Sequence, residues 1–313
     1  MRILLAGGTG VLGRSLTPLL TAEGHQVSSL GRGTGNALRA DLLDREAVLR
    51  AVDGLRFDAV VHAATALAGR SMGRHQDMLP TDELRIAGTA NLLAAARATG
   101  AGRLVAESMM FGYGYGDHGD RPLTEQGTAF GPKGANAWLE RHVGAMRTLE
   151  GLTLGAQDVE GVALRFGLFY GAGVTDTTLL PLLRRRALPV VADQDRQLAW
   201  TYVPDAAAAV LAALHHGRAG RAYNIADDAP VGFGRHIRAV AEAFGTPRPL
   251  KVPLWVMRAA PLAYSVMSTN LRLSSARAKA ELGWAPSFPD SVAGVRELAR
   301  QLGAGAKPLG AAG

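Results

Sequence analysis

The chain has 313 residues, of which 48% are hydrophobic and 19% charged, so it can bury a large core and is not a disordered chain. It contains no cysteine, which excludes disulfide bonds, thiolate catalysis and cysteine-ligated metals and fits the reducing cytoplasm. The net charge of +7 comes mostly from scattered arginines, and the one run, Arg184 to Arg186, lacks interleaved aromatic residues, so we predict no nucleic-acid partner.

Neither of the two most apolar stretches predicts a membrane segment. Residues 1–16 place an arginine before an apolar run, as a signal peptide does, but four glycines interrupt that run. Residues 252–267 are broken by Pro253, Arg258 and Pro261 and are too short to span a bilayer. We therefore expect a cytoplasmic protein with no membrane partner.

Short apolar runs alternate with helical patterns through the first half of the chain. Strands are predicted at residues 3–6, 26–30, 59–62 and 104–106. Helices are predicted at residues 12–23, 45–52, 82–99 and 137–149. Pro18 lies inside the first helix and is expected to kink it or shift its start. This alternation predicts an α/β Rossmann fold with a doubly wound parallel sheet.

A glycine-rich turn, Gly7-Gly8-Thr9-Gly10-Val11-Leu12-Gly13, joins the first strand to the first helix. Gly7 permits the tight turn, Gly10 lets the backbone approach a pyrophosphate, and Gly13 allows the helix to pack closely on the strand. The helix N-terminus adds free N–H donors and a partial positive charge. The sequence therefore predicts a dinucleotide site, to which Thr9, Val11 and Leu12 also belong.

The choice between NADH and NADPH depends on the end of the second strand. An NAD-preferring Rossmann fold usually places Asp or Glu there, on the ribose 2′-hydroxyl. Here the sequence is Gly31-Arg32-Gly33, without a carboxylate. A guanidinium can bind a 2′-phosphate bidentately, so Arg32 favours NADP(H), unless it is only a solvated loop residue.

The pattern is less regular after residue 161. Strands are predicted at residues 162–166 and 223–226, and helices at residues 237–244 and 274–282. We expect residues 1–165 to form the NADP-binding Rossmann domain, with residues 201–226 returning to it. A smaller C-terminal substrate-binding subdomain would comprise residues 166–200 and 227–302, followed by a disordered tail at 303–313. Within it, residues 254–267 would be a lid over a large planar ligand, ordinary subdomain helices or a dimer contact.

Several further segments resemble the extended short-chain dehydrogenase/reductase family, in its NAD-dependent epimerase/dehydratase branch. They are residues 41–42, 57–64, 88–93, 165–171, 200–206, 223–226 and 279–286. The resemblance covers the chain to about residue 300 and implies a Rossmann fold with a nicotinamide cofactor. It also implies that Asp41 and Leu42 contact the adenine and that Ala63, Ala64 and Thr65 border the cofactor.

The family's catalytic pair is missing. Its members use a Tyr-x-x-x-Lys motif, in which the tyrosine is the general acid/base and the lysine lowers its pKa and holds the ribose. None of the six tyrosines here is followed four residues later by lysine. Matching Glu140 to the family's helix glutamate puts Pro132 at the tyrosine position and Asn136 at the lysine position. Arg85 takes the place of the asparagine in the preceding helix.

Three functions are compatible with a chain that keeps the cofactor-binding segments but lacks the catalytic Tyr-x-x-x-Lys motif. The first is an NADPH-dependent ketoreductase for a polycyclic aromatic ketone, whose own phenol or enol hydroxyl supplies the proton. Some tailoring ketoreductases of antibiotic pathways resemble this chain. The second is a non-catalytic NADP(H)-binding sensor or assembly protein. The third, a sugar-nucleotide epimerase or dehydratase, is disfavoured because it depends on the missing tyrosine. We expect a small-molecule substrate and a monomer or homodimer.

Ser108 and Tyr113 carry the hydroxyl groups that remain beyond the predicted strand at 104–106. We expect both to touch the substrate, although Ser108 can also cap the strand end and Tyr113 can also be a packing residue. Tyr115, His118 and Lys133 are further candidates, with packing or solvation as alternative roles. The eight histidines show no metal-ligand spacing, so no metal site is predicted.

Overall fold

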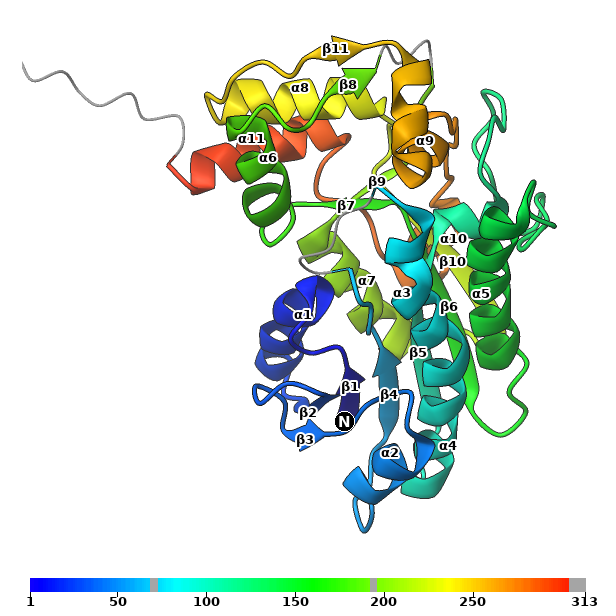
Figure 1. The fold of residues 1–313 in the computed structure, drawn as a ribbon. Coiled ribbons are helices and arrows are strands. Elements are labelled where there is room, and N and C mark those ends of the chain that lie inside the picture. Colours follow the sequence, from blue (N-terminus) through cyan, green and yellow to red (C-terminus); the bar gives the residue numbers. More distant parts are fainter. Residues whose placement is uncertain (68–72, 192–195, 304–313) are drawn as a thin grey trace, which may run out of the picture.

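The computed structural model describes residues 1–67, 73–191 and 196–303 and contains the predicted doubly wound parallel sheet (Figure 1). Its strand order is β10-β6-β5-β4-β1-β2-β3, and every neighbouring pair is parallel. The strands are β1 (Arg2–Ala6), β2 (Gln26–Gly31), β3 (Leu38–Arg39), β4 (Ala59–His62), β5 (Arg103–Met109), β6 (Glu160–Phe166) and β10 (Arg221–Ile225). The order reverses between β1 and β4, the place where such sheets bind a dinucleotide.

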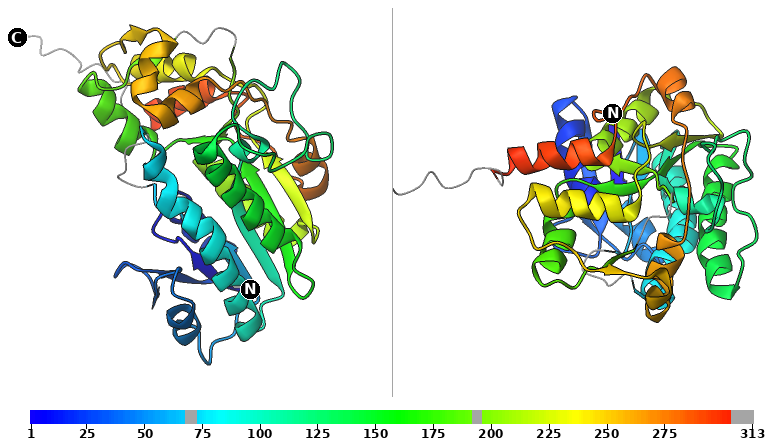
Figure 2. Two further views of the ribbon diagram at one scale, coloured as in Figure 1. Left: turned by 45° about the vertical axis from the view of Figure 1, so that its right-hand side comes forward. Right: turned by 90° about the horizontal axis from the view of Figure 1, so that it is seen from above.

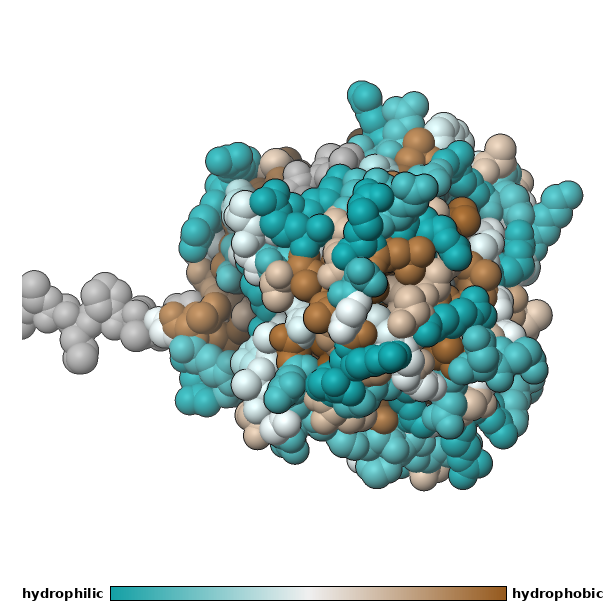
Figure 3. Space-filling model, turned by 90° about the horizontal axis from the view of Figure 1, so that it is seen from below, coloured by the Kyte–Doolittle hydropathy of each residue, from teal (hydrophilic) through white to brown (hydrophobic). Residues whose placement is uncertain are grey.

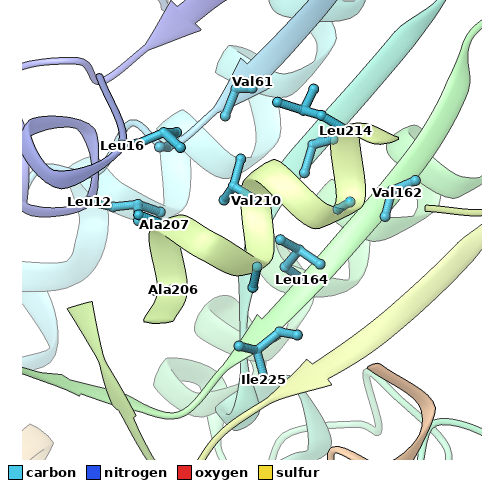
Figure 4. Close-up of a cluster of buried hydrophobic side chains, with 14 of the residues drawn as sticks. Leu12, Leu16, Val61, Val162, Leu164, Ala206, Ala207, Val210, Leu214 and Ile225 are labelled. Carbon is cyan, nitrogen blue, oxygen red and sulfur yellow. The ribbon is translucent and has the colours of Figure 1, made fainter. Parts of the chain in front are cut away.

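Helices cover both faces of this sheet. One face carries α1 (Val11–Ala22) and α7 (Val203–His216), whose Leu12, Leu16, Val210 and Leu214 form a buried cluster with the strands (Figure 4). The other face carries α2 (Arg45–Ala51), α4 (Thr89–Thr99) and α5 (Ala137–Leu154); Figure 2 (left) shows the cyan and green helices lying over the strands. Burial on both faces explains why the central strands β1 and β4 are almost continuously apolar.

Two local expectations for the helices differ from the structure. The first helix begins at Val11 and continues through Pro18 to Ala22, so Pro18 does not shift its start. The predicted helix 82–99 is longer and composite: it comprises α3 (Leu79–Glu83), a π-helical turn η2 (Leu84–Gly88) and α4. An extra residue in a π turn changes the direction in which side chains leave the helix, and such turns are frequent at functional sites.

The C-terminal segments form a second layer above the carboxyl ends of the strands (Figure 1). Two small parallel sheets join β7 (Leu168–Tyr170) to β9 (Trp200–Tyr202), and β8 (Val190–Val191) to β11 (Lys251–Val252). The remaining helices and helical turns of the chain, not all of which belong to the second layer, are η1 (His75–Met78), η3 (Met110–Tyr113), η4 (Thr175–Leu179), α6 (Leu180–Arg184), α8 (Phe233–Ala243), η5 (Leu254–Ala259), α9 (Pro261–Met267), α10 (Ala276–Leu282) and α11 (Ser291–Gln301).

One of these helices does not follow the expected division of the chain. α10 packs on α7 and β10, and its Ala278 and Leu282 belong to the buried cluster of the main sheet. The expected substrate subdomain at 227–302 is therefore not a single unit, because α10 returns to the Rossmann sheet. Of the expected tail, residues 304–313 lie outside the described part of the chain.

The second layer contains a buried carboxyl group with a strongly shifted pKa. Asp227 is only 4% exposed and lies near Tyr170 and Asp205. Burial raises the pKa of Asp227 to about 8, and the Tyr170 hydroxyl opposes this shift only in part. The fold therefore accommodates Asp227 mainly as the neutral acid.

We expect the free energy of unfolding to fall as the pH rises from about 4, the ordinary carboxyl pKa, to about 8. Asp227 contributes at most about 1.4 kcal/mol per pH unit to the slope, since its folded state holds one proton that the unfolded state releases. Asp227→Asn should remove this contribution and make the slope smaller, whereas the exposed neighbour Asp228→Asn should not. Thermal unfolding between pH 5 and pH 9 measures it, and equal slopes in all three proteins would contradict the assignment.

None of the described helices is long and apolar enough to cross a membrane. Figure 3 shows the underside of the molecule, where hydrophilic residues occupy most of the rim and apolar residues lie toward the middle. The large hydrophobic side chains that are exposed include Leu43, Leu55 and, in η5 of the second layer, Trp255.

Candidate dinucleotide-binding and active site

Gly7 and Gly13 hold the turn between β1 and α1 together. Gly7 has a φ of +90°, and a Cβ atom placed there would lie 2.3 Å from the carbonyl oxygen of Ala63, the residue that follows β4. A Cβ atom at Gly13 would lie 2.2 Å from the Gly7 carbonyl oxygen. Both glycines are therefore required by the protein's own packing, whether or not a ligand is bound.

Gly10 has a different environment. Its φ of −75° is open to any residue, and a Cβ atom there would meet only the Gly7 carbonyl oxygen, at 3.1 Å. Thr9 beside it is exposed, and Gly10 precedes the first helical residue, Val11. The N–H groups of Val11, Leu12 and Gly13 belong to the first turn of α1, where a helix offers donors without helical acceptors. The open space in front of these N–H groups fits a pyrophosphate.

The predicted adenine-side residues lie together at the next loops. Arg32 follows β2 with 74% of its side chain exposed, and its Nη1 lies 3.9 Å from an Asp41 carboxylate oxygen. Leu42 is buried in the core against α4, and its carbonyl oxygen accepts a hydrogen bond of 2.8 Å from Asn91. The exposed guanidinium of Arg32 is thus free to rotate toward an added phosphate.

Ala63, Ala64 and Thr65 continue from β4 beside the glycine turn. The Ala63 N–H donates to the Ala6 carbonyl oxygen at 2.9 Å, which extends the pairing of β4 with β1 by one residue. Ala63 is buried, Ala64 is partly buried and Thr65 is exposed. The structure therefore brings the predicted cofactor residues to one edge of the sheet.

Ser108 and Tyr113 belong to a buried network instead of an open site, which differs from the expectation that they touch substrate. Each is 1% exposed. The Ser108 hydroxyl donates to Glu150 at 2.6 Å, and Arg165 forms a bidentate ion pair with the same carboxylate. Arg165 also donates to the Tyr113 hydroxyl at 2.7 Å, which in turn donates to Asn224. Alternation along β5 turns Ser108 toward α5, which carries Glu150.

The residues at the expected Tyr-x-x-x-Lys positions have structural or solvated roles. Asn136 caps α5 by accepting a hydrogen bond of 3.0 Å from the Leu139 N–H. Pro132 and Lys133 are exposed in the loop before the helix. The His118 ring contacts the Gly114 carbonyl oxygen at 3.0 Å. The start of α5 therefore presents neither the acid nor the ammonium group of the family pattern.

Glu107 and Arg85 are not among the functional residues that the sequence predicts. Glu107 precedes Ser108 on β5 and faces the opposite side of the sheet, beside the end of β4. Arg85 lies in the π turn and is 5% exposed, with its Nη1 3.5 Å from Asp82. Burial raises the pKa of Glu107 to about 7, and the Arg85 charge opposes part of this shift. The strand alternation was a signal that could have identified Glu107.

A chain of buried polar groups continues from Asp82. Its carboxylate lies 2.6 Å from Nδ1 of His142, and Nε2 of His142 lies 3.1 Å from Nδ1 of His75. The His75 ring stacks on Trp138 at the start of α5. Asp82 and His142 are fully buried, so their contact fixes α3 against α5. Tyr115 lies near Asp82 and Arg85, and burial raises its pKa above the ordinary value.

The chain belongs to the NAD dependent epimerase/dehydratase family, whose model matches residues 3–226. A 3-diazoavenalumate denitrifying reductase from Streptomyces sp is 34% identical over 92% of this chain and 97% of the relative. A 2-alkyl-3-oxoalkanoate reductase from Stenotrophomonas maltophilia is 33% identical over 79% and 77%. These relatives make the chain an NAD(P)-dependent oxidoreductase, which argues against the non-catalytic sensor.

Solved structures with little sequence identity share the fold. The human epimerase family protein SDR39U1 with NADPH has a TM-score of 0.77 and 20% identity, over 96% of this chain and 99% of that one. The UDP-glucose 4-epimerase of Thermotoga maritima with UDP-glucose has a TM-score of 0.76 and 19% identity, over 96% and 98%. These likenesses support the Rossmann architecture.

Proposed function

We propose that the protein is an NADPH-dependent ketoreductase for a polycyclic aromatic ketone that carries a hydroxyl group beside the carbonyl. The observation that carries this proposal is the engagement of Ser108 and Tyr113 in the buried Glu150–Arg165 network, with no tyrosine at the start of α5. Bound NADPH would supply hydride to the carbonyl carbon. The neighbouring hydroxyl would give its proton to the carbonyl oxygen, leaving a delocalised phenolate.

In this proposal the chain binds and orients instead of donating the first proton. The glycine turn and the α1 N-terminus would hold the pyrophosphate, and Arg32 the 2′-phosphate. We propose that residues 166–200 and much of 227–302 enclose the substrate in the second layer, in a cytoplasmic monomer or homodimer. The apolar η5 and α9, with Trp255 67% exposed, suit a lid over a planar ligand.

The test is NADPH consumption with a panel of fused-ring aryl ketones, half of which carry a hydroxyl group beside the carbonyl. We expect turnover to be confined to the hydroxylated half. Turnover of unhydroxylated ketones at equal rates would contradict the proposal, because the protein would then supply the proton itself.

The diazo-reducing relative favours a second candidate, the reduction of an aromatic diazo group beside a hydroxyl. It is similar to this chain over nearly the full length of both proteins. A protonated hydroxyaryl diazo compound is a diazonium cation, so hydride addition at the terminal nitrogen needs no acid. Transfer of that hydrogen to carbon then releases dinitrogen and leaves the arene. Dinitrogen release from an ortho-diazophenol, without reduction of any ketone, would select this candidate.

Arg32→Ala should weaken NADPH binding by about 1.5–3 kcal/mol, the contribution of hydrogen bonds to a charged group. NADH, which lacks the 2′-phosphate, should bind almost as before. Arg50→Ala removes another surface arginine, paired with Glu46, and serves as the control. Titration calorimetry with both cofactors measures the difference. Equal losses of NADPH and NADH affinity would show that Arg32 does not read the phosphate.

A further inference from the structure

Glu107 lies on the cofactor side of β5. The residues before and after it on the same side are Val105, which packs in the α1–α7 core, and Met109. Its register neighbour on β4 follows from the pairing of His62 with Ala106, which places Glu107 beside Ala63. Because the adenine side lies toward β2, the other half of a dinucleotide at the β1–β4 reversal lies over β4 and β5. Glu107 therefore stands where the reacting end of the cofactor belongs.

The carboxyl group of Glu107 has no structural partner. It forms no hydrogen bond and no ion pair with any residue in the described ranges, whereas Glu150 on the other side of the sheet has both. The nearest charge that acts on it is Arg85, which the π turn carries over the strand ends. The side chain is partly exposed and bonds to no described residue, so a structural role does not explain its place on β5.

We infer that Glu107 is a catalytic acid that contacts the substrate's hydroxyl oxygen and protonates the phenolate formed there. The inference rests on the proposed ketone reduction. The O–H bond of the Glu107 carboxyl group breaks, its proton forms the O–H bond of the product phenol, and the carboxylate remains opposite Arg85. Water then returns a proton to Glu107, so charge and atoms balance.

The environment of Glu107 suits this step. Its pKa of about 7 keeps a large share of the group protonated near neutral pH, whereas an ordinary glutamate would be almost fully ionised. Arg85 stabilises the carboxylate once the proton has left. Asp82 on α3 forms an ion pair with Arg85, and Tyr115 in the loop after η3 lies within reach of the Arg85 charge, so Asp82 positions the guanidinium.

The test is a cycle of two changes, Glu107→Gln in the protein and methylation of the hydroxyl in the substrate. The probes are peri-hydroxytetralone and its methyl ether, with saturating NADPH. We expect Glu107→Gln to slow reduction of the hydroxy compound about 10²-fold, the lower range for a positioned acid. Reduction of the methyl ether, already slow, should be nearly unchanged by the same substitution, because Glu107 acts only on the free hydroxyl.

The pH profile separates this role from a structural one. In the wild type, turnover of the hydroxy compound should fall as the pH rises through about 7, where Glu107 loses its proton. In Glu107→Gln this fall in turnover should be absent, whereas the control variant Glu46→Gln, which changes an exposed carboxyl group, should keep it. Equal slowing of both compounds, or an unchanged fall in Glu107→Gln, would overturn the inference.

A binding measurement distinguishes failure of this inference from failure of the proposed function. If the wild type reduces neither compound, ketone reduction is wrong, yet Glu107 can still be examined in the NADP⁺ complex. Binding of peri-hydroxytetralone near pH 7.5 should take up protons, measured by calorimetry in two buffers of different ionisation enthalpy. Loss of the uptake in Glu107→Gln supports the contact, and uptake equal to that of the wild type refutes it.

Discussion

Gly10→Val should abolish dinucleotide binding while lowering the free energy of unfolding by only about 1 kcal/mol, the cost of a poor N-cap residue at the start of α1. The backbone at Gly10 has a φ that valine adopts readily, and the added Cβ atom meets only one protein atom, at 3.1 Å. The side chain would instead occupy the space in front of the α1 N-terminus. Loss of two charge-assisted hydrogen bonds to the pyrophosphate costs about 3 kcal/mol or more, which is over about 100-fold in affinity.

Gly13→Ala provides the matched contrast in the same turn. Its Cβ atom would lie 2.2 Å from the Gly7 carbonyl oxygen and 2.6 Å from the Gly8 Cα atom, so we expect a loss of about 1–3 kcal/mol in stability. Cofactor titration by fluorescence and thermal unfolding of both variants measure the two effects separately. A Gly10→Val protein that binds NADPH with wild-type affinity would show that the phosphates lie elsewhere.

The Rossmann half was predictable because its signals are local. Strands β1, β4 and β5 are buried on both faces, so they read as short apolar runs, and the glycine turn lies within seven residues of sequence. Helices were expected between the strands at 162–166 and 223–226, but the bounds of α7 were not predicted, although it supplies much of one core. Its alanine-rich segment, VPDAAAAVLAALHH, has too few polar residues to show a clear 3.6-residue period.

The catalytic region was less predictable because it depends on which side of β5 each residue faces. The family resemblance drew attention to Ser108, yet register turns Ser108 to α5 and its neighbour Glu107 to the cofactor side. Arg85 reaches the same place only because a π turn interrupts the helix that was expected to be regular. That the Arg85 charge acts on Glu107 could therefore be seen only in the tertiary structure.

Methylation of the substrate's hydroxyl should slow reduction by about 10²–10⁴-fold, the range for general-acid catalysis. The hydroxyl is the one acid held beside the carbonyl oxygen throughout the reaction, and a methyl ether cannot replace it. Rates must be compared at saturating substrate, because the methyl group can also weaken binding.

Single replacements of Ser108, Tyr113, Tyr115, His118 and Lys133 should each leave substantial turnover by the same reasoning. Ser108→Ala and Tyr113→Phe remove hydroxyls from the Glu150–Arg165 network, so they should lower the unfolding temperature more than the catalytic rate. Lys133 is exposed, and its replacement should change neither quantity. Thermal unfolding and single-turnover kinetics with bound NADPH distinguish the two kinds of effect. Any one of these five variants that binds cofactor and substrate normally but has lost turnover would reveal a protein acid in place of the substrate's own.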